Sequence, residues 1–251
     1  MLFKKHSIEN YRTYLMSIAV LAGILLLFMG FVSYNNNGYL PQGVQAAFFV
    51  SFLLFAGCIF TSMVFTDLGD KKKAIPTLTL PASDFEKYLV GWIYSFLVFQ
   101  VVFVALFYLT ATIVIHLGHP STPERSNSLL NIFTNDLRPQ PYYGFVIYTF
   151  LHAITFLGAI YFEKMHFIKT AFALFIGAFL LAIINKPIMS SMINETITGG
   201  TIFSPVDITD GKKHWTIHQA SLQDIIGAIV LGMVVLVLWI SAYYKLKEKE
   251  V

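Results

Sequence analysis

Charged residues are scarce in this chain, and their scarcity excludes most soluble folds. Only 12% of the 251 residues are charged, whereas 56% are hydrophobic; a soluble globular domain carries roughly 25% charged residues. The mean hydropathy is correspondingly high, at +0.67. A net charge of +3 is too small to indicate nucleic-acid binding. The composition therefore predicts a protein whose main partner is the lipid bilayer.

Cysteine and the common catalytic motifs are also missing or nearly so. The single cysteine, Cys58, lies in an apolar run, so no internal disulfide can form, and we interpret it as a small buried hydrophobe. The sequence has no Gly-x-x-x-x-Gly-Lys-Ser/Thr phosphate loop, no His-Glu-x-x-His pair and no Gly-x-Ser-x-Gly. We therefore expect no catalytic residues, no metal ligands and no cofactor in this chain.

Long apolar runs are what the chain has in abundance. A helix of about 20 apolar residues crosses the ~30 Å hydrocarbon core of a bilayer. We predict an all-α polytopic membrane protein that forms a single transmembrane domain over residues 1–251. Its external loops would cover residues 117–141 and 185–224. The six expected transmembrane helices cover approximately residues 15–34, 44–65, 88–116, 142–162, 167–184 and 222–244.

Smaller elements are expected between and before the spans. Residues 1–12 interleave apolar and basic side chains, which is typical of a helix lying in the membrane interface; a plain charged flank is the alternative. Residues 128–134 are expected to form a second short interfacial helix. β-Branched and aromatic residues in 197–203 and 214–217 indicate short strands.

The basic residues predict the orientation of the chain. If the N-terminus, the 66–88 segment, the 163–166 turn and the C-terminus share one side, that side holds twelve Lys and Arg residues against five opposite. Basic residues in short loops favour the cytosol. We therefore expect both termini in the cytosol.

The membrane interior is expected to hold almost no ionisable side chain. His152 is the exception, and an intramembrane ionisable group is a candidate functional residue. A metal site with Glu163 and His166 is one interpretation, but the spacing favours a neutral, hydrogen-bonded core histidine. A carrier coupled to ions needs intramembrane charges, so their scarcity argues against that class.

The most distinctive polar stretch is the segment 66–88, which we call the elbow. Its charges surround the apolar residues Leu78 and Leu80, an arrangement that suits docking to a protein; a solvated loop with ordinary lysines is the alternative. Ser83 and Glu86 have capping-box spacing ahead of an apolar run, so a helix is expected to begin near Ser83. The charged residues of the elbow are Asp67, Asp70, Lys71, Lys72, Lys73, Asp84, Glu86 and Lys87.

The elbow resembles the cytosolic segment of ABC-2-type (type V) transporter permeases. The likeness covers residues 69–91: a start rich in glycine and lysine, then Leu78, Pro81 and Ser83, then the charged helix start at Glu86 and Lys87. The six-span count and the missing phosphate loop agree with that family. The long polar loop 185–224 departs from it, because the family often has an apolar hairpin there.

The resemblance implies a function that the composition alone does not. The chain would be the permease subunit of an ATP-binding-cassette exporter in the inner membrane, paired with a second permease chain. The elbow would be a coupling helix docked on a separate ATPase subunit, which would hold ATP and Mg²⁺. A non-transporting scaffold subunit of a larger envelope complex is the alternative, and loop 185–224 is a candidate site for an external protein or ligand. The expected ATPase contacts are Lys71, Lys72, Lys73, Leu78, Leu80, Pro81, Ser83, Asp84, Glu86 and Lys87.

Overall fold

The protein is an all-α polytopic membrane protein. The computed structural model describes residues 2–64, 83–118, 127–133, 137, 140–162, 165–193, 197–199, 206–210, 213–217 and 221–248. Within them, six helical stretches are long and apolar enough to cross a membrane. The helices are α1 (Leu2–Asn35), α2 (Gln42–Met63), α4 (Asp84–Trp92), the π-helix η2 (Ile93–Val98), α5 (Phe99–Leu117), α6 (Tyr143–Tyr161), α7 (His166–Ile193) and α8 (Ser221–Glu248).

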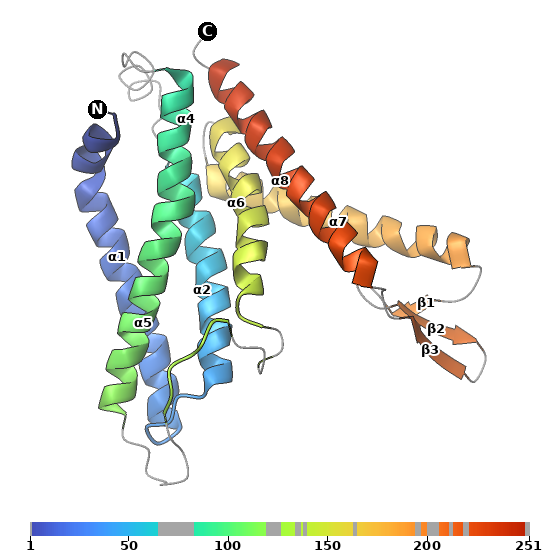
Figure 1. Ribbon diagram of the computed structural model, residues 1–251, viewed down its shortest axis with the longest axis horizontal. Coiled ribbons are helices and arrows are strands. Elements are labelled where there is room, and N and C mark those ends of the chain that lie inside the picture. Colours follow the sequence, from blue (N-terminus) through green and yellow to red (C-terminus); the bar gives the residue numbers. More distant parts are fainter. Residues whose placement is uncertain are drawn as a thin grey trace.

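Four of the spans form a bundle, and the last two diverge from it (Figure 1). α1, α2, α6 and the continuous rod α4–η2–α5 lie side by side, whereas α7 leaves the bundle at a wide angle and α8 crosses back toward it. α1 and α4 begin, and α8 ends, at the same end of the molecule, at the top of Figure 1. We call this the terminal end.

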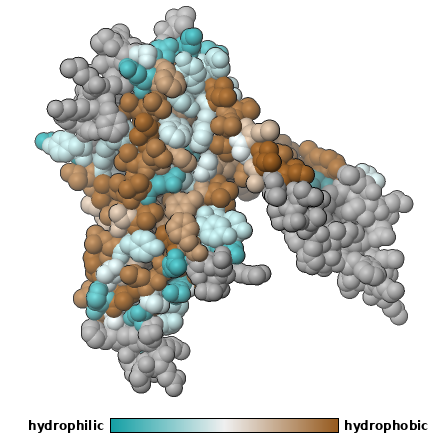
Figure 2. Space-filling view, viewed as in Figure 1, coloured by the Kyte–Doolittle hydropathy of each residue, from teal (hydrophilic) through white to brown (hydrophobic). Residues whose placement is uncertain are grey.

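The core of the bundle is built from aromatic rings. Phe49 on α2 is fully buried and packs against Phe103, Phe107 and Phe145, with ring centroids 5.1–5.6 Å apart. Such edge-to-face and tilted pairs add to the energy of the buried area. Much of the outer surface is apolar as well (Figure 2), as lipid contact requires. The bundle is therefore held together by packing rather than by charge.

A buried glutamine fastens the segment 127–132 to the end of the bundle opposite the terminal end. Gln45 is fully buried, and its Nε2 donates to the carbonyls of Leu40 (3.0 Å) and Ser128 (2.9 Å). Its Oε1 accepts from the amide of Leu130 at 3.0 Å. These bonds hold the segment against the bundle. The expected helix over 128–134 is absent from the described residues 128–133. Side chains of the bundle take their backbone groups instead: Gln45 bonds Ser128 and Leu130, Gln42 bonds Leu129, and Tyr108 bonds the Leu130 carbonyl.

Replacing Gln45 with leucine should release this segment. Leucine is apolar and ends one atom short of the amide oxygen and nitrogen, so the Leu130 amide and the carbonyls of Leu40 and Ser128 lose their partner, at a cost of about 1–2 kcal/mol. Hydrogen exchange at the Leu130 amide should accelerate by roughly tenfold, because 1.4 kcal/mol corresponds to that factor. Ser51→Leu, at an exposed position on the same helix, is the control. Equal exchange in both variants would show that Gln45 does not hold the segment.

Two boundaries differ from the sequence-based expectation. No break separates an interfacial helix at residues 1–12 from the first span, since α1 is continuous from Leu2 to Asn35. Residues 2–22 contain neither glycine nor proline, so nothing in them ends a helix. The fifth span, Phe167–Asn185, agrees with the expected range 167–184, but its helix α7 continues beyond it to Ile193, with Pro187 inside the helix. The expected external loop 185–224 is correspondingly shorter.

The expected strands are present, with one more between them. β1 (Ile197–Gly199), β2 (Val206–Asp210) and β3 (Lys213–Ile217) form a three-stranded antiparallel sheet in the order β1-β2-β3. Val206 pairs with Ile217 and Asp210 with Lys213, so β2 and β3 form a hairpin. The sheet lies between α7 and α8, away from the bundle (Figure 1).

Candidate functional site

The part of the elbow that the structure describes is the start of α4. Ser83 has extended backbone angles, and its Oγ accepts a hydrogen bond from the amide of Glu86 at 3.2 Å. This is the N-cap that the spacing of Ser83 and Glu86 predicts. Asp84 and Glu86 lie in the first turn, where negative charge is favoured by the helix dipole. The elbow therefore enters the third span as a capped, rigid helix.

The first turns of α4 pack against the end of α8. Phe85 and Tyr88 contact Tyr243 edge to face, with centroids 6.1 Å and 5.6 Å apart. Tyr88 Oη also donates to the backbone carbonyl of Trp239 at 2.9 Å. If the start of α4 moved, these contacts would move the end of α8 with it, although the two helices are far apart in the sequence.

The π-helix η2 forms the next connection, to α6. The amide of Phe99 donates to the carbonyls of Tyr94 and Phe96 and not to that of Ser95, which it would use in a regular α-helix. The carbonyl of Ser95 accepts instead from Tyr148 Oη, at 2.7 Å. π-Helical turns are rare and are frequently found at functional sites. Here the π-helical turn leaves the carbonyl of Ser95 free to accept the hydrogen bond from Tyr148 on α6.

His152 lies at the centre of the polar contacts around η2. It is fully buried; its Nε2 is 2.9 Å from Ser95 Oγ, and its Nδ1 is 3.4 Å from Trp239 Nε1. An indole nitrogen can only donate, so Nδ1 accepts and the neutral imidazole carries its proton on Nε2. Ser95 then passes the donation on to the carbonyl of Gly91, at 2.8 Å. This chain of hydrogen bonds joins α8, α6 and the third span.

A shell of aromatic rings surrounds the imidazole and excludes water. Phe96, Tyr148, Phe156 and Trp239 lie around His152, with centroid distances of 5.0–6.1 Å. Hydrogen bonds in such a dry environment are stronger than in water, and an unpaired group there is costly. We name Ser95, Tyr148, His152 and Trp239 the η2 network. It fixes the relative position of three spans.

The structure brings together only part of the expected site. Ser83, Asp84, Glu86 and Lys87 lie on the first turn of α4 or cap it, and His152 is the hydrogen-bonded core histidine that the sequence favours. The remaining predicted contacts, Lys71, Lys72, Lys73, Leu78, Leu80 and Pro81, lie outside the described residues, as does Glu163.

Three partners of His152 were not singled out from the sequence. Ser95, Tyr148 and Trp239 are ordinary span residues by composition, and their only common signal is a hydrogen-bonding group within an apolar run. Among the residues that the structure describes, no three His, Cys, Asp or Glu side chains gather to hold a metal ion.

No protein-family model matches this chain. Searches of the curated proteins and of the solved structures find no match either. The fold and the η2 network therefore stand on their own geometry.

Proposed function

We propose that this chain is the permease subunit of an ATP-binding-cassette exporter of the ABC-2 type. Both termini and the elbow would lie in the cytosol, with the protein in the cytoplasmic (inner) membrane. ATP hydrolysis would take place in a separate subunit docked on the elbow, and a second permease chain, identical or different, would complete the pathway. The likeness of residues 69–91 to the coupling segment of that family is the starting point of the proposal.

The observation that carries the proposal is the continuity between the elbow and the η2 network. The helix that leaves the elbow is capped at Ser83, contacts α8 through Tyr88, and reaches α6 through Ser95. A force applied at the elbow would therefore move α6 and α8 together with the third span. A loop with no mechanical role does not require such a connection.

Reversing the three elbow lysines, Lys71, Lys72 and Lys73, to glutamate should abolish ATPase docking. Like charges across an interface cost several kcal/mol, so recovery of the ATPase should fall on the order of tenfold or more. The measurement is purification of the tagged protein in mild detergent, with identification of any co-purified chain that carries a phosphate loop. Its amount relative to the permease is then compared between variants.

The matched control makes the same charge change on the C-terminal tail, at Lys245, Lys247 and Lys249. Unchanged thermal unfolding of both variants would show that the spans are intact. Equal ATPase recovery from the elbow variant and the control would contradict the docking role of the elbow.

The sheet between α7 and α8 favours a second candidate function. A folded β2–β3 hairpin on a loop of a membrane protein is suited to binding another protein, so the chain could be a non-transporting scaffold in a larger envelope complex. The same purification separates the two functions. Recovery of envelope proteins without an ATPase, abolished by deletion of the hairpin 206–217, would support the scaffold.

A further inference from the structure

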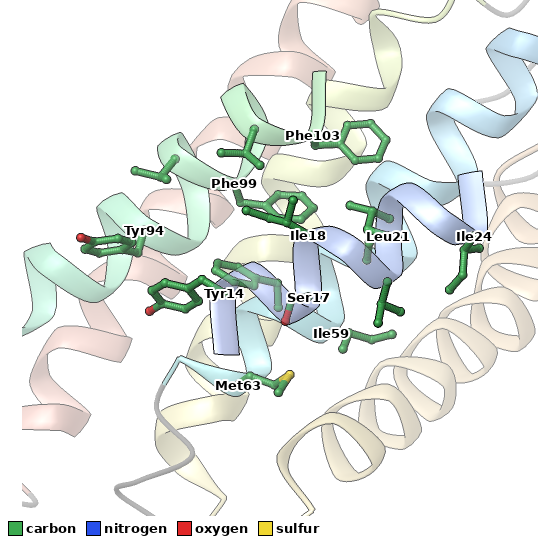
Figure 3. A pocket seen from close by; sticks show the side chains of 15 residues that line it. Tyr14, Ser17, Ile18, Leu21, Ile24, Ile59, Met63, Tyr94, Phe99 and Phe103 are labelled. Carbon is green, nitrogen blue, oxygen red and sulfur yellow. The ribbon is translucent and has the colours of Figure 1, made fainter. Parts of the chain in front are cut away.

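An apolar cavity opens in the side of the bundle, at its terminal end. It lies between the first half of α1, the last turns of α2 and the rod η2–α5, and has a volume of about 380 Å³. This is within the ~300–1,000 Å³ range of small-molecule sites. Figure 3 shows Ile18 and Leu21 of α1 on one side of it, opposite Phe99 and Phe103 of α5.

The cavity lies along the part of α1 between Tyr14, whose ring packs against Phe60 and Tyr94, and Leu25, where α1 is buried in the bundle. Within the part of α1 whose side chains are described, the first buried residue is Leu25, followed by Met29 and Ser33. Residues 11–24 of α1 are exposed or half-buried. Protein interiors are close-packed, so a void of this size in a membrane is filled by something that the bilayer provides.

The walls select hydrocarbon rather than water. A buried water needs about two to four polar partners, and all the lining side chains except those of Tyr14, Ser17 and Tyr94 are apolar. The mouth is formed by Val20, Ile24, Ile59 and Met63, which are 37–54% exposed on the outer surface of the spans. An occupant therefore enters sideways from the lipid.

The length of the cavity matches one acyl chain. The lining residues of α1 extend from Tyr14 to Ile24, which is about 15 Å at 1.5 Å per residue. That is half of the ~30 Å hydrocarbon core, the depth of one leaflet. The hydroxyl groups of Tyr14, Ser17 and Tyr94 lie toward the terminal end, where the glycerol backbone of such a lipid would be.

The charge beyond the terminal end of the cavity specifies the headgroup. Arg12 is exposed and precedes Tyr14 on α1, so it lies about 3 Å further along the axis. Lys4 and Lys5 belong to the same helix, and Glu9 is its only acidic residue before Tyr14. A basic side chain near the surface of a bilayer attracts anionic lipids, at about 1 kcal/mol.

We propose that this cavity holds one acyl chain of an anionic phospholipid whose phosphate lies beside Arg12. The lipid wedges α1 against α2 and η2–α5 and completes the packing that the protein leaves open. This role does not depend on the transport function proposed above.

The test uses the full chain in mixed phosphatidylcholine–phosphatidylglycerol vesicles. A photoactivatable group is placed in the acyl chain of either lipid, and labelled peptides are mapped by mass spectrometry. Phosphatidylglycerol should label the cavity walls in α1, α2 and α5 about fivefold more than phosphatidylcholine does, which corresponds to ~1 kcal/mol. Equal labelling by both lipids, or uniform labelling of all six spans, would overturn the proposal.

Two filling variants and two controls locate the lipid. Ile59→Trp should displace the chain and remove most of the labelling, whereas Ile240→Trp, at a similarly exposed position (46% and 54%), should not. Val20→Phe fills the same mouth from α1 and should also reduce the labelling. It replaces Ile59→Trp if that variant does not fold. Arg12→Gln should abolish the preference for phosphatidylglycerol, while Lys247→Gln leaves it unchanged. Equal effects of a variant and its control would refute the site.

Discussion

Replacing Gly57 with leucine should separate α2 from α6 and lower the free energy of unfolding by about 3 kcal/mol. A Cβ atom at Gly57 would contact Tyr148 Cε2 and come within 3.0 Å of Phe99 Cε1. Tyr148 cannot yield, because its ring is fully buried and its hydroxyl is bonded to Ser95. Overpacking of a tight core costs typically about 1–3 kcal/mol, and this site lies at the upper end.

Thermal unfolding in detergent, followed by tryptophan fluorescence, measures this effect. A loss of about 3 kcal/mol should lower the melting temperature by roughly 6–12 °C, at ~2–4 °C per kcal/mol for a chain of this size. Gly232→Leu is the matched control, since a Cβ there meets nothing within 4 Å, and better helix propensity should make it neutral or slightly stabilising. Equal melting temperatures for both variants would show that α2 and α6 are not in close contact at Gly57.

Removing the imidazole of His152 should be at least as damaging. His152→Ala leaves a cavity among four aromatic rings and takes hydrogen-bond partners from Ser95 and Trp239. Large-to-small changes of buried rings cost about 3–5 kcal/mol. His152→Phe keeps the ring and gives up only its hydrogen bonds, so it should retain most of the stability. Denaturant unfolding of the two variants separates ring packing from hydrogen bonding.

A double-mutant cycle then isolates the bond between His152 and Ser95. In the unmodified chain, Ser95→Ala leaves the Nε2 proton of His152 buried and unpaired, at a cost of about 2 kcal/mol. In the His152→Phe background no such proton exists, so the same substitution should cost well under 1 kcal/mol. Additive effects would mean that the side chains of His152 and Ser95 are not coupled, and that only the bond from Tyr148 to the Ser95 carbonyl joins α6 to the third span.

The six spans could be predicted from hydropathy because the bilayer imposes one simple requirement. Each span must present about 20 apolar residues, and the expected ranges 44–65 and 142–162 agree with α2 and α6 to within two residues. Helix start chemistry is equally local, so the cap at Ser83 could be read from the spacing of Ser83 and Glu86.

Long-range contacts could not be predicted in the same way. The path of residues 127–132 depends on Gln45, more than eighty positions earlier. The π-helix depends on Tyr148 and on the packing of α6, and nothing within 93–98 distinguishes it from an ordinary apolar helix. His152 was identifiable because it is rare in its surroundings, whereas its partners were not. Rarity marks a residue in a sequence, but only the fold shows what the residue touches.

The π-helical turn η2 makes the third span more sensitive to deletions than to substitutions. Its acceptor for Tyr148 is the carbonyl of Ser95, a group that every amino acid possesses. Point substitution at residue 95 therefore cannot erase it. A change in length can, because deletion of one residue between 93 and 98 would let the helix close into regular α geometry and recapture the carbonyl. The hydrogen bond between Tyr148 and Ser95 therefore depends on the number of residues in the turn more than on their identity.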